Sequence, residues 1–167
     1  MTISMYQASV PVFVQLLKGL SGVLDKAEAH CTAKKIDPVT LPSTRLIADM
    51  FPLTRQVQIA TDFAKGVTAR LAGVEVPTWE DNEKTIPELK ARIAKTIAYV
   101  ETFKPGQIDG SEDREISLKV GGNPMTFKGQ QYLLHFGTPN FYFHTTSAYS
   151  ILRANGIDLG KRDFMGM

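Results

Sequence analysis

The chain has 167 residues, of which 43% are hydrophobic and 22% charged, so its composition excludes a disordered or fibrous protein, and we expect residues 1–167 to form one domain. The net charge of +2 comes from scattered residues without a Lys/Arg run, which argues against a nucleic-acid partner. No apolar run reaches the roughly 18 residues of a membrane span, and no signal-peptide pattern is recognisable. With a single cysteine, Cys31, the sequence predicts a cytoplasmic protein without a membrane partner.

The first two helical patterns occupy the N-terminal half of the chain. Apolar residues recur every three to four positions from about Ser4 to Lys34, which predicts a long amphipathic helix opened by a capping box. A second pattern runs from about Ser43 to Ala72. Pro52 should either kink this helix or begin its main section after a short turn. The expected inner face consists of Leu46, Leu53, Val57, Ala60, Ala64, Val67 and Leu71, and the expected outer face of Arg55, Gln58, Asp62 and Lys65.

The C-terminal half shows two more helices with a short β-structure between them. A capping-box pattern at Thr85 and Glu88 opens a third helix that extends to about Phe103. Alternating apolar residues around Gly121-Gly122 predict a β-hairpin, and a fourth helix covers residues 129–154. Four long amphipathic helices without internal repeats predict an all-α fold, namely a four-helix bundle with a small hairpin insertion between helices three and four.

The fourth helix holds two of the three histidines, His135 and His144, on either side of Gly137-Thr138-Pro139. A separation of nine residues places them on opposite faces of a continuous helix, so they cannot share one metal ion. Asn140 lies one turn before His144 on the same, inward face. A buried neutral imidazole needs a hydrogen-bond partner, which either a tyrosine hydroxyl or an amide from a facing helix can supply.

Two residues near the core edge of the second helix, Gln56 and Asp49, are placed to face His144. His144, Asn140 and Gln56 therefore predict either a hydrogen-bonded core histidine or a polar pocket. If zinc or nickel bound here, its ligands would be one imidazole and two amides, and amide oxygens bind these ions poorly. The carboxylate of Asp49 would be a stronger additional ligand. His135 is a secondary pocket candidate if the helix bends at Gly137–Pro139.

The segment HTTSAYSILRANG, with His144, Leu152-Arg153 and Gly156, resembles the last-helix signature of the DinB-like superfamily of four-helix bundles. The segments YQASVPVFVQLL, DMFPLTRQVQIATDFAKG and YLLHFGTPNFYFHTTSAY are similar to a bacterial branch known only as a domain of unknown function. The resemblance implies a homodimer with a pocket between helices two and four. In many members three histidines hold a divalent metal, and some of these are thiol transferases or isomerases.

Only one of the three ligand positions of that superfamily is a histidine in this chain. His144 matches the final ligand, whereas the other two positions fall at Asn140 and at Gln56 to Gln58. The metal site is therefore expected to be degenerate or lost, and three interpretations remain open. The protein is a small-molecule-binding bundle, a metal-dependent enzyme that uses His144, or a non-catalytic structural homodimer.

Overall fold

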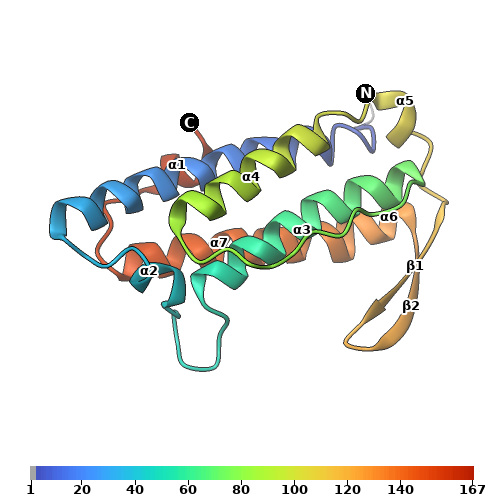
Figure 1. Ribbon diagram of the computed structural model, residues 1–167. Coiled ribbons are helices and arrows are strands. Elements are labelled where there is room, and N and C mark those ends of the chain that lie inside the picture. The colour runs from blue at the N-terminus through green and yellow to red at the C-terminus, as the bar shows by residue number, and fades with distance from the viewer. Residues whose placement is uncertain (1–2) are drawn as a thin grey trace.

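Four long helices lie side by side in the structure, a computed structural model that describes residues 3–167 (Figure 1). They are α1 Val10–Lys34, α3 Leu53–Ala72, α4 Ile86–Val100 and α7 Thr138–Ala154. The shorter elements are α2 Thr40–Ser43, α5 Pro105–Ile108, β1 Glu115–Val120, β2 Asn123–Lys128, α6 Gly129–Gln131, the π-helix η1 Tyr132–Gly137 and α8 Lys161–Met165. The described chain is therefore mostly helical, with one small antiparallel sheet.

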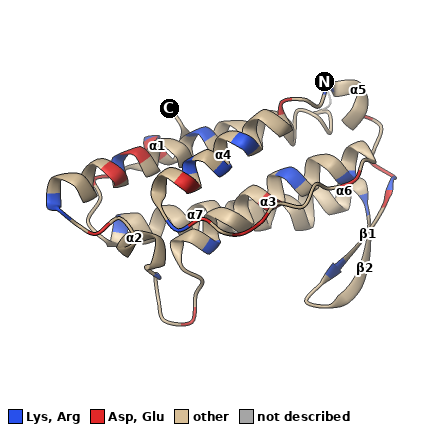
Figure 2. Ribbon diagram, viewed as in Figure 1, with Lys and Arg blue, Asp and Glu red and all other residues tan. Residues whose placement is uncertain are grey.

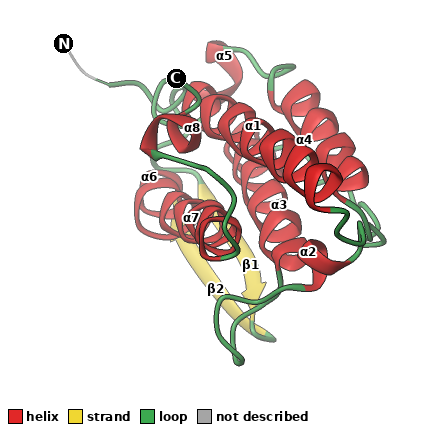
Figure 3. Ribbon diagram, turned by 90° about the vertical axis from the view of Figure 1, so that its left-hand side faces the viewer, coloured by secondary structure: helices red, strands yellow, loops and turns green. Residues whose placement is uncertain are grey.

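Figure 3 shows the four long helices grouped together, and most of the buried apolar side chains of the core come from these helices. Helix α1 packs against α4 and α7, and α3 packs against the same two helices. Phe13 of α1 and Phe141 of α7 meet edge to face, with their ring centroids 4.9 Å apart. The single cysteine, Cys31, is buried in this core. The apolar faces predicted from the three- and four-residue spacing are thus brought together, because burying them removes their surface from water.

The first helix begins at Val10 and not at Ser4. The Ser4 hydroxyl accepts a hydrogen bond from the backbone N–H of Gln7 at 3.3 Å, but residues 5–9 form turns. Pro11 lies in the first turn of α1. A proline is favourable there because its missing N–H would have no partner in that turn, so the helix starts just before it.

The second helical pattern is divided by a loop at residues 44–52. Helix α3 begins after Pro52, so of the two predicted effects of Pro52, a kink or a new start, the structure has the second. The N–H of Leu53 donates to the carbonyl of Thr44 at 2.9 Å and closes the loop. Leu46 was expected on the inner face but lies in this loop and is 38% exposed. Pro52 disfavours a helical conformation at Phe51, so the helical wheel of α3 cannot be continued back to Leu46.

The predicted hairpin is confirmed, with Val120 paired to Asn123 across a two-residue turn. Gly121 and Gly122 have φ angles of +56° and +86°, the left-handed values that a tight turn of this kind requires. The hairpin lies at the end of the helices opposite α2 (Figure 1). The third helix is also confirmed, with the capping box formed by Thr85 and Glu88.

Residues 129–154 are helical throughout, as predicted, but the segment is not a uniform α-helix. The section that follows α6, η1, is a π-helix that ends at Gly137, two residues before Pro139. Pro139 has no N–H to donate back along the helix, and a π-turn accommodates that gap without ending the segment. A methyl group on Gly137 would lie 2.5 Å from Val67, so this glycine allows close packing against α3.

The C-terminal residues return to the body of the molecule through α8. Phe164 packs edge to face against Tyr149 of α7, with centroids 5.7 Å apart, and anchors the C-terminal segment to the bundle. Asp163 forms an ion pair with Lys26 of α1 at 2.7 Å. A Cβ on Gly19 would approach the carbonyl of Phe164 to 2.5 Å, so α8 contacts the backbone of α1 directly.

Candidate functional site

His144 projects from α7 toward α3 and is 8% exposed. Its Nδ1 lies 2.7 Å from Oε1 of Gln56, which is itself buried. The amide nitrogen of Gln56 donates to the carbonyl of Phe51 at 3.1 Å, and this second bond fixes which end of the amide faces the imidazole. Since Oε1 can only accept, Nδ1 of His144 carries the proton and Nε2 keeps a free lone pair.

The surroundings of His144 keep its imidazole uncharged at neutral pH. Burial, together with the positive charge of Arg55, lowers the pKa of His144 to about 4. The ring of Phe63 stacks against the imidazole with centroids 6.1 Å apart, and Phe143 meets it edge-on at 5.2 Å. Within residues 3–167, Gln56 is the only hydrogen-bond partner of the His144 side chain. The Nε2 atom is therefore a neutral acceptor with spare capacity.

A cavity of about 230 Å³ adjoins this imidazole. Its apolar wall comes from Met50, Phe51 and Phe143, and its polar groups come from Asp49, Gln56 and His144. Asp49 and Gln56 were expected to face His144, and both line the same cavity as this histidine. The partner of the imidazole is the amide of the facing helix rather than a tyrosine hydroxyl of its own helix. Asp49 lies in the 44–52 loop and does not cap α3.

Asn140 and His135 are not among the residues that line this cavity. The side chain of Asn140 donates from Nδ2 to the carbonyl of Phe136 at 2.7 Å, one turn earlier. His135 is exposed on the π-helix, whereas His144 is buried. The opposite placement of the two histidines agrees with the nine-residue separation, and the π-turn does not bring them together.

The donor set at this cavity does not suit a three-histidine metal centre. Residues 3–167 contain no group of three or more His, Cys, Asp or Glu side chains that could hold a metal ion. One nitrogen of His144 is occupied by Gln56, so the remaining strong donors are its other nitrogen and the exposed carboxylate of Asp49. Protein sites for zinc use three or four ligands of this strength.

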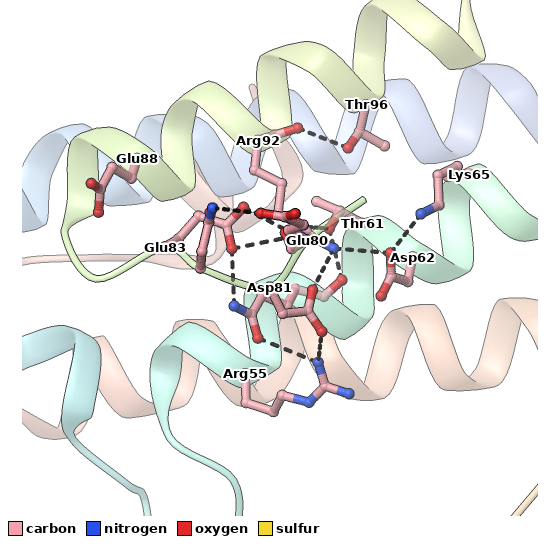
Figure 4. Close-up of polar contacts among 12 residues, drawn as sticks. Arg55, Thr61, Asp62, Lys65, Glu80, Asp81, Glu83, Glu88, Arg92 and Thr96 are labelled. Carbon is pink, nitrogen blue, oxygen red and sulfur yellow. Dashed lines mark hydrogen bonds and ion pairs between the residues drawn. The ribbon is translucent and has the colours of Figure 1, made fainter. Parts of the chain in front are cut away.

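A second polar site, which the sequence did not reveal, is built around Arg92 of α4 (Figure 4). The Arg92 side chain is 2% exposed. Its Nε donates to the hydroxyl of Thr61 at 2.8 Å, and its Nη1 donates to the carbonyl of Glu80 at 3.0 Å. Its Nη2 forms ion pairs with Asp62 at 2.9 Å and with Asp81 at 3.0 Å, and its Nη1 forms one with Glu83 at 3.0 Å.

The carboxylates around Arg92 are paired again on their outer side. Asp62 contacts Lys65 at 2.9 Å, Asp81 forms an ion pair with Arg55, and Glu83 accepts from Gln58 at 2.9 Å. Burial opposes the charge of Arg92, but the neighbouring carboxylates outweigh it, so the pKa of Arg92 is raised. We call this group the Arg92 network; its members are Arg92, Thr61, Asp62, Asp81, Glu83, Arg55, Gln58 and Lys65.

The Arg92 network corrects one prediction about α3. Gln58 and Lys65 were expected on a solvent-facing side, yet they are 4% and 5% exposed. The acidic connection between α3 and α4 runs along this face and covers it (Figure 2). Trp79 of the same connection lies between the amino groups of Lys65 and Lys95, each 4.4 Å from a Trp79 ring centroid. The sequence feature that could have indicated this cover is the acidic run EDNE, residues 80–83, which lies between two helices that carry basic residues.

Comparisons with known proteins agree with this architecture. The model of DUF1993, a domain of unknown function, matches residues 5–165. A crystal structure of a DinB family member from Shewanella denitrificans is 40% identical, with a TM-score of 0.87, and the match covers 97% of this chain and 92% of that one. No curated protein matches the chain. No helix in residues 3–167 is both long and apolar enough to cross a membrane. The chain therefore belongs to the DUF1993 family and is a DinB family member.

Proposed function

We propose that this protein is a metal-free DinB-type four-helix bundle that binds a small organic molecule between α3 and α7. The observation that carries the proposal is the fixed orientation of the His144 imidazole. Gln56 occupies Nδ1, and the cavity of about 230 Å³ adjoins the side chain whose Nε2 has no partner within residues 3–167. The Nε2 atom is accessible from the cavity, so a ligand with a hydrogen-bond donor can bind to it without breaking a bond within the chain.

The groups around the cavity define the chemistry of its ligand. The neutral imidazole accepts a hydrogen bond, and the carboxylate of Asp49 favours a cation or a donor over an anion. The side chains of Met50, Phe51 and Phe143 suit an apolar body. The expected ligand class is thus a small aromatic or aliphatic amine or alcohol. With its pKa near 4, His144 acts as an acceptor at neutral pH and not as a proton donor.

Titration of the protein with benzylamine and benzyl alcohol, followed by NMR, tests this proposal. We expect saturable shifts at Gln56, Phe143 and the 44–52 loop, which His144→Phe abolishes while it keeps a ring against Phe63. The matched control is His135→Phe, which changes an exposed histidine of the same helical segment. Equal responses of the two variants would contradict the proposal.

Elemental mass spectrometry of the same protein separates this function from that of a metal-dependent enzyme. Samples are measured as isolated and after loading with zinc or nickel, with His144→Phe alongside. We expect substoichiometric metal in every sample. A stoichiometric metal ion that disappears in His144→Phe would replace our proposal with the metalloenzyme alternative, related to thiol transferases or isomerases.

A homodimer is the second proposal, and it rests on the exposed apolar residues around the same cavity. Phe51 and Phe143 line its mouth and are 53% and 57% exposed, and Ile47 of the adjoining loop is 59% exposed. Such residues at one place are typical of a protein contact. Light scattering after size exclusion should give a dimer mass that Phe143→Ser converts to a monomer mass. A monomer mass for the unmodified protein would overturn this proposal.

A further inference from the structure

A second cavity, of about 440 Å³, lies between the hairpin and the outer side of α3. The hairpin contributes Leu118 to Gly121, and η1 contributes Tyr132 and Phe136. The ring of Phe63, from α3, lies 5.7 Å from that of Phe136, and the rings of Tyr132 and Phe136 stack at 5.9 Å. The cavity thus has an aromatic wall built from two elements that are distant in sequence.

Arg70 supplies a positive charge to this cavity that no carboxylate neutralises. Its Nη1 donates to the hydroxyl of Tyr132 at 3.0 Å, and no carboxylate within residues 3–167 forms an ion pair with it. A Cβ on Gly66 would lie 2.6 Å from this Nη1. The absence of a side chain at Gly66, one helical turn before Arg70, therefore leaves room for the guanidinium. The other charged α3 residues at the cavity, Arg55 and Asp62, are paired within the Arg92 network.

Tyr132 adds a buried hydroxyl beside the guanidinium. Its side chain is fully buried, and it accepts the hydrogen bond from Arg70 while its own O–H has no acceptor within residues 3–167. Burial raises the pKa of Tyr132, although Arg70 opposes this, so the phenol keeps its proton. The buried hydroxyl is not reached from the cavity, and its role is to hold the guanidinium of Arg70 in place.

We propose that this cavity binds a small organic carboxylate with an aromatic or apolar body. The carboxylate accepts hydrogen bonds from Arg70, whose planar guanidinium suits both carboxylate oxygens and is positioned by the hydroxyl of Tyr132. The apolar body lies against Phe63, Phe136 and Leu118, and the exposed Lys119 adds positive charge at the rim. This site is separate from the His144 cavity, whose Asp49 favours ligands of the opposite charge.

Calorimetric titration with 3-phenylpropanoate tests the site, with 3-phenylpropan-1-ol as the uncharged probe. We expect the carboxylate to bind saturably and the alcohol to bind at least about tenfold more weakly, because hydrogen bonds to charged groups are the stronger ones. Arg70→Met should weaken carboxylate binding by about ten- to a hundredfold. Tyr132→Phe, which keeps the buried ring, should weaken it roughly two- to tenfold.

Arg114→Met is the matched control, because Arg114 is an exposed arginine that does not line the cavity. This variant should bind 3-phenylpropanoate as the unmodified protein does. No saturation up to about 10 mM, or equal affinities of Arg70→Met and Arg114→Met, would overturn the proposal. If Arg70→Met does not fold, Tyr132→Phe decides, since unchanged affinity in that variant contradicts the positioning of Arg70 by this hydroxyl. Loss of binding in His144→Phe alone would assign the probe to the other cavity and overturn this site.

Discussion

Two polar sites meet the buried sides of α3, and they differ in how completely their hydrogen bonds are used. Arg92 donates from Nε and both Nη atoms to a hydroxyl, a carbonyl and three carboxylates. His144 has one partner, Gln56, and a second ring nitrogen beside a cavity. The charged site is saturated by its own chain, whereas the neutral site retains an unused acceptor.

This difference distinguishes a structural cluster from a binding group. A saturated network holds segments together, and in this protein it fixes the connection between α3 and α4 to both helices (Figure 4). A group with spare capacity beside a cavity is able to recognise a ligand. Arg55 joins the two sites, because it forms an ion pair with Asp81 and also lowers the pKa of His144.

The largest effect is expected from Arg92→Met. This change leaves the carboxylates of Asp62, Asp81 and Glu83 without their central partner, and breaking a buried ion pair costs about 3–5 kcal/mol of unfolding free energy. Urea denaturation measures the loss. The control is Lys95→Met on the exposed side of the same helix, for which we expect a loss of no more than about 1 kcal/mol. Similar losses in both variants would contradict a central role for Arg92.

The pH dependence of the unfolding free energy should show that the His144 imidazole is uncharged in the folded protein. Because its pKa is about 4 in the folded protein and near 6.5 in the unfolded chain, the unfolded state binds the proton more readily between these values. The contribution of His144 to stability is complete above pH 6.5 and is lost as the pH falls through 4, a change of about 3 kcal/mol. Denaturation from pH 7 to pH 4 should show a shallower decline in His144→Phe. Parallel curves for the two proteins would argue against a buried neutral imidazole.

Gln56→Leu should have an intermediate effect. It removes the acceptor of the Nδ1 proton of His144, and an unsatisfied buried donor costs about 1–3 kcal/mol. The comparison variant is Gln130→Leu, an exposed glutamine whose replacement should change stability by less than about 0.5 kcal/mol. Adding Gln56→Leu to His144→Phe should cost less than Gln56→Leu alone. Additive losses would show that the two side chains do not interact.

The smallest loss of stability is expected from Arg55→Met. Its ion pair with Asp81 is more than one-third exposed on both sides, and pairs of this kind contribute about 0–1 kcal/mol. The same change should raise the pKa of His144, because a nearby positive charge disfavours the imidazolium. NMR titration of the imidazole measures the shift. An unchanged pKa would mean that burial alone lowers it.

Local signals in the sequence were sufficient for much of the fold. The capping box at Thr85 and Glu88 located the third helix, and Gly121-Gly122 located the hairpin turn. The inward sides of two helical wheels predicted that His144 is buried and left two possible partners, a tyrosine hydroxyl or an amide of the facing helix; the structure has the amide. These features depend on neighbouring residues or on one helix face, which a sequence records directly.

Contacts made by irregular segments were not accessible in the same way. The burial of Gln58 and Lys65 depends on a connection that crosses their face, and a helical wheel contains no information about such a cover. Asn140 shares the inward side with His144 on an ideal helix, yet its amide bonds to the carbonyl of Phe136 in the π-helix. A helical wheel assumes one regular helix and an uncovered outer face; the first assumption fails near Asn140, and the second fails at Gln58 and Lys65.

The π-helix η1 also determines how Tyr132 and His144 are rotated relative to each other about the helix axis. Tyr132 is the first residue of η1 and lines the cavity near the hairpin. His144 lies beyond the last residue of η1 and lines the other cavity. A π-turn holds one residue more than the corresponding α-turn. Deleting a single residue there would rotate Tyr132 by about 100° relative to His144. The segment therefore acts as a spacer, and its length links the geometry of one cavity to that of the other.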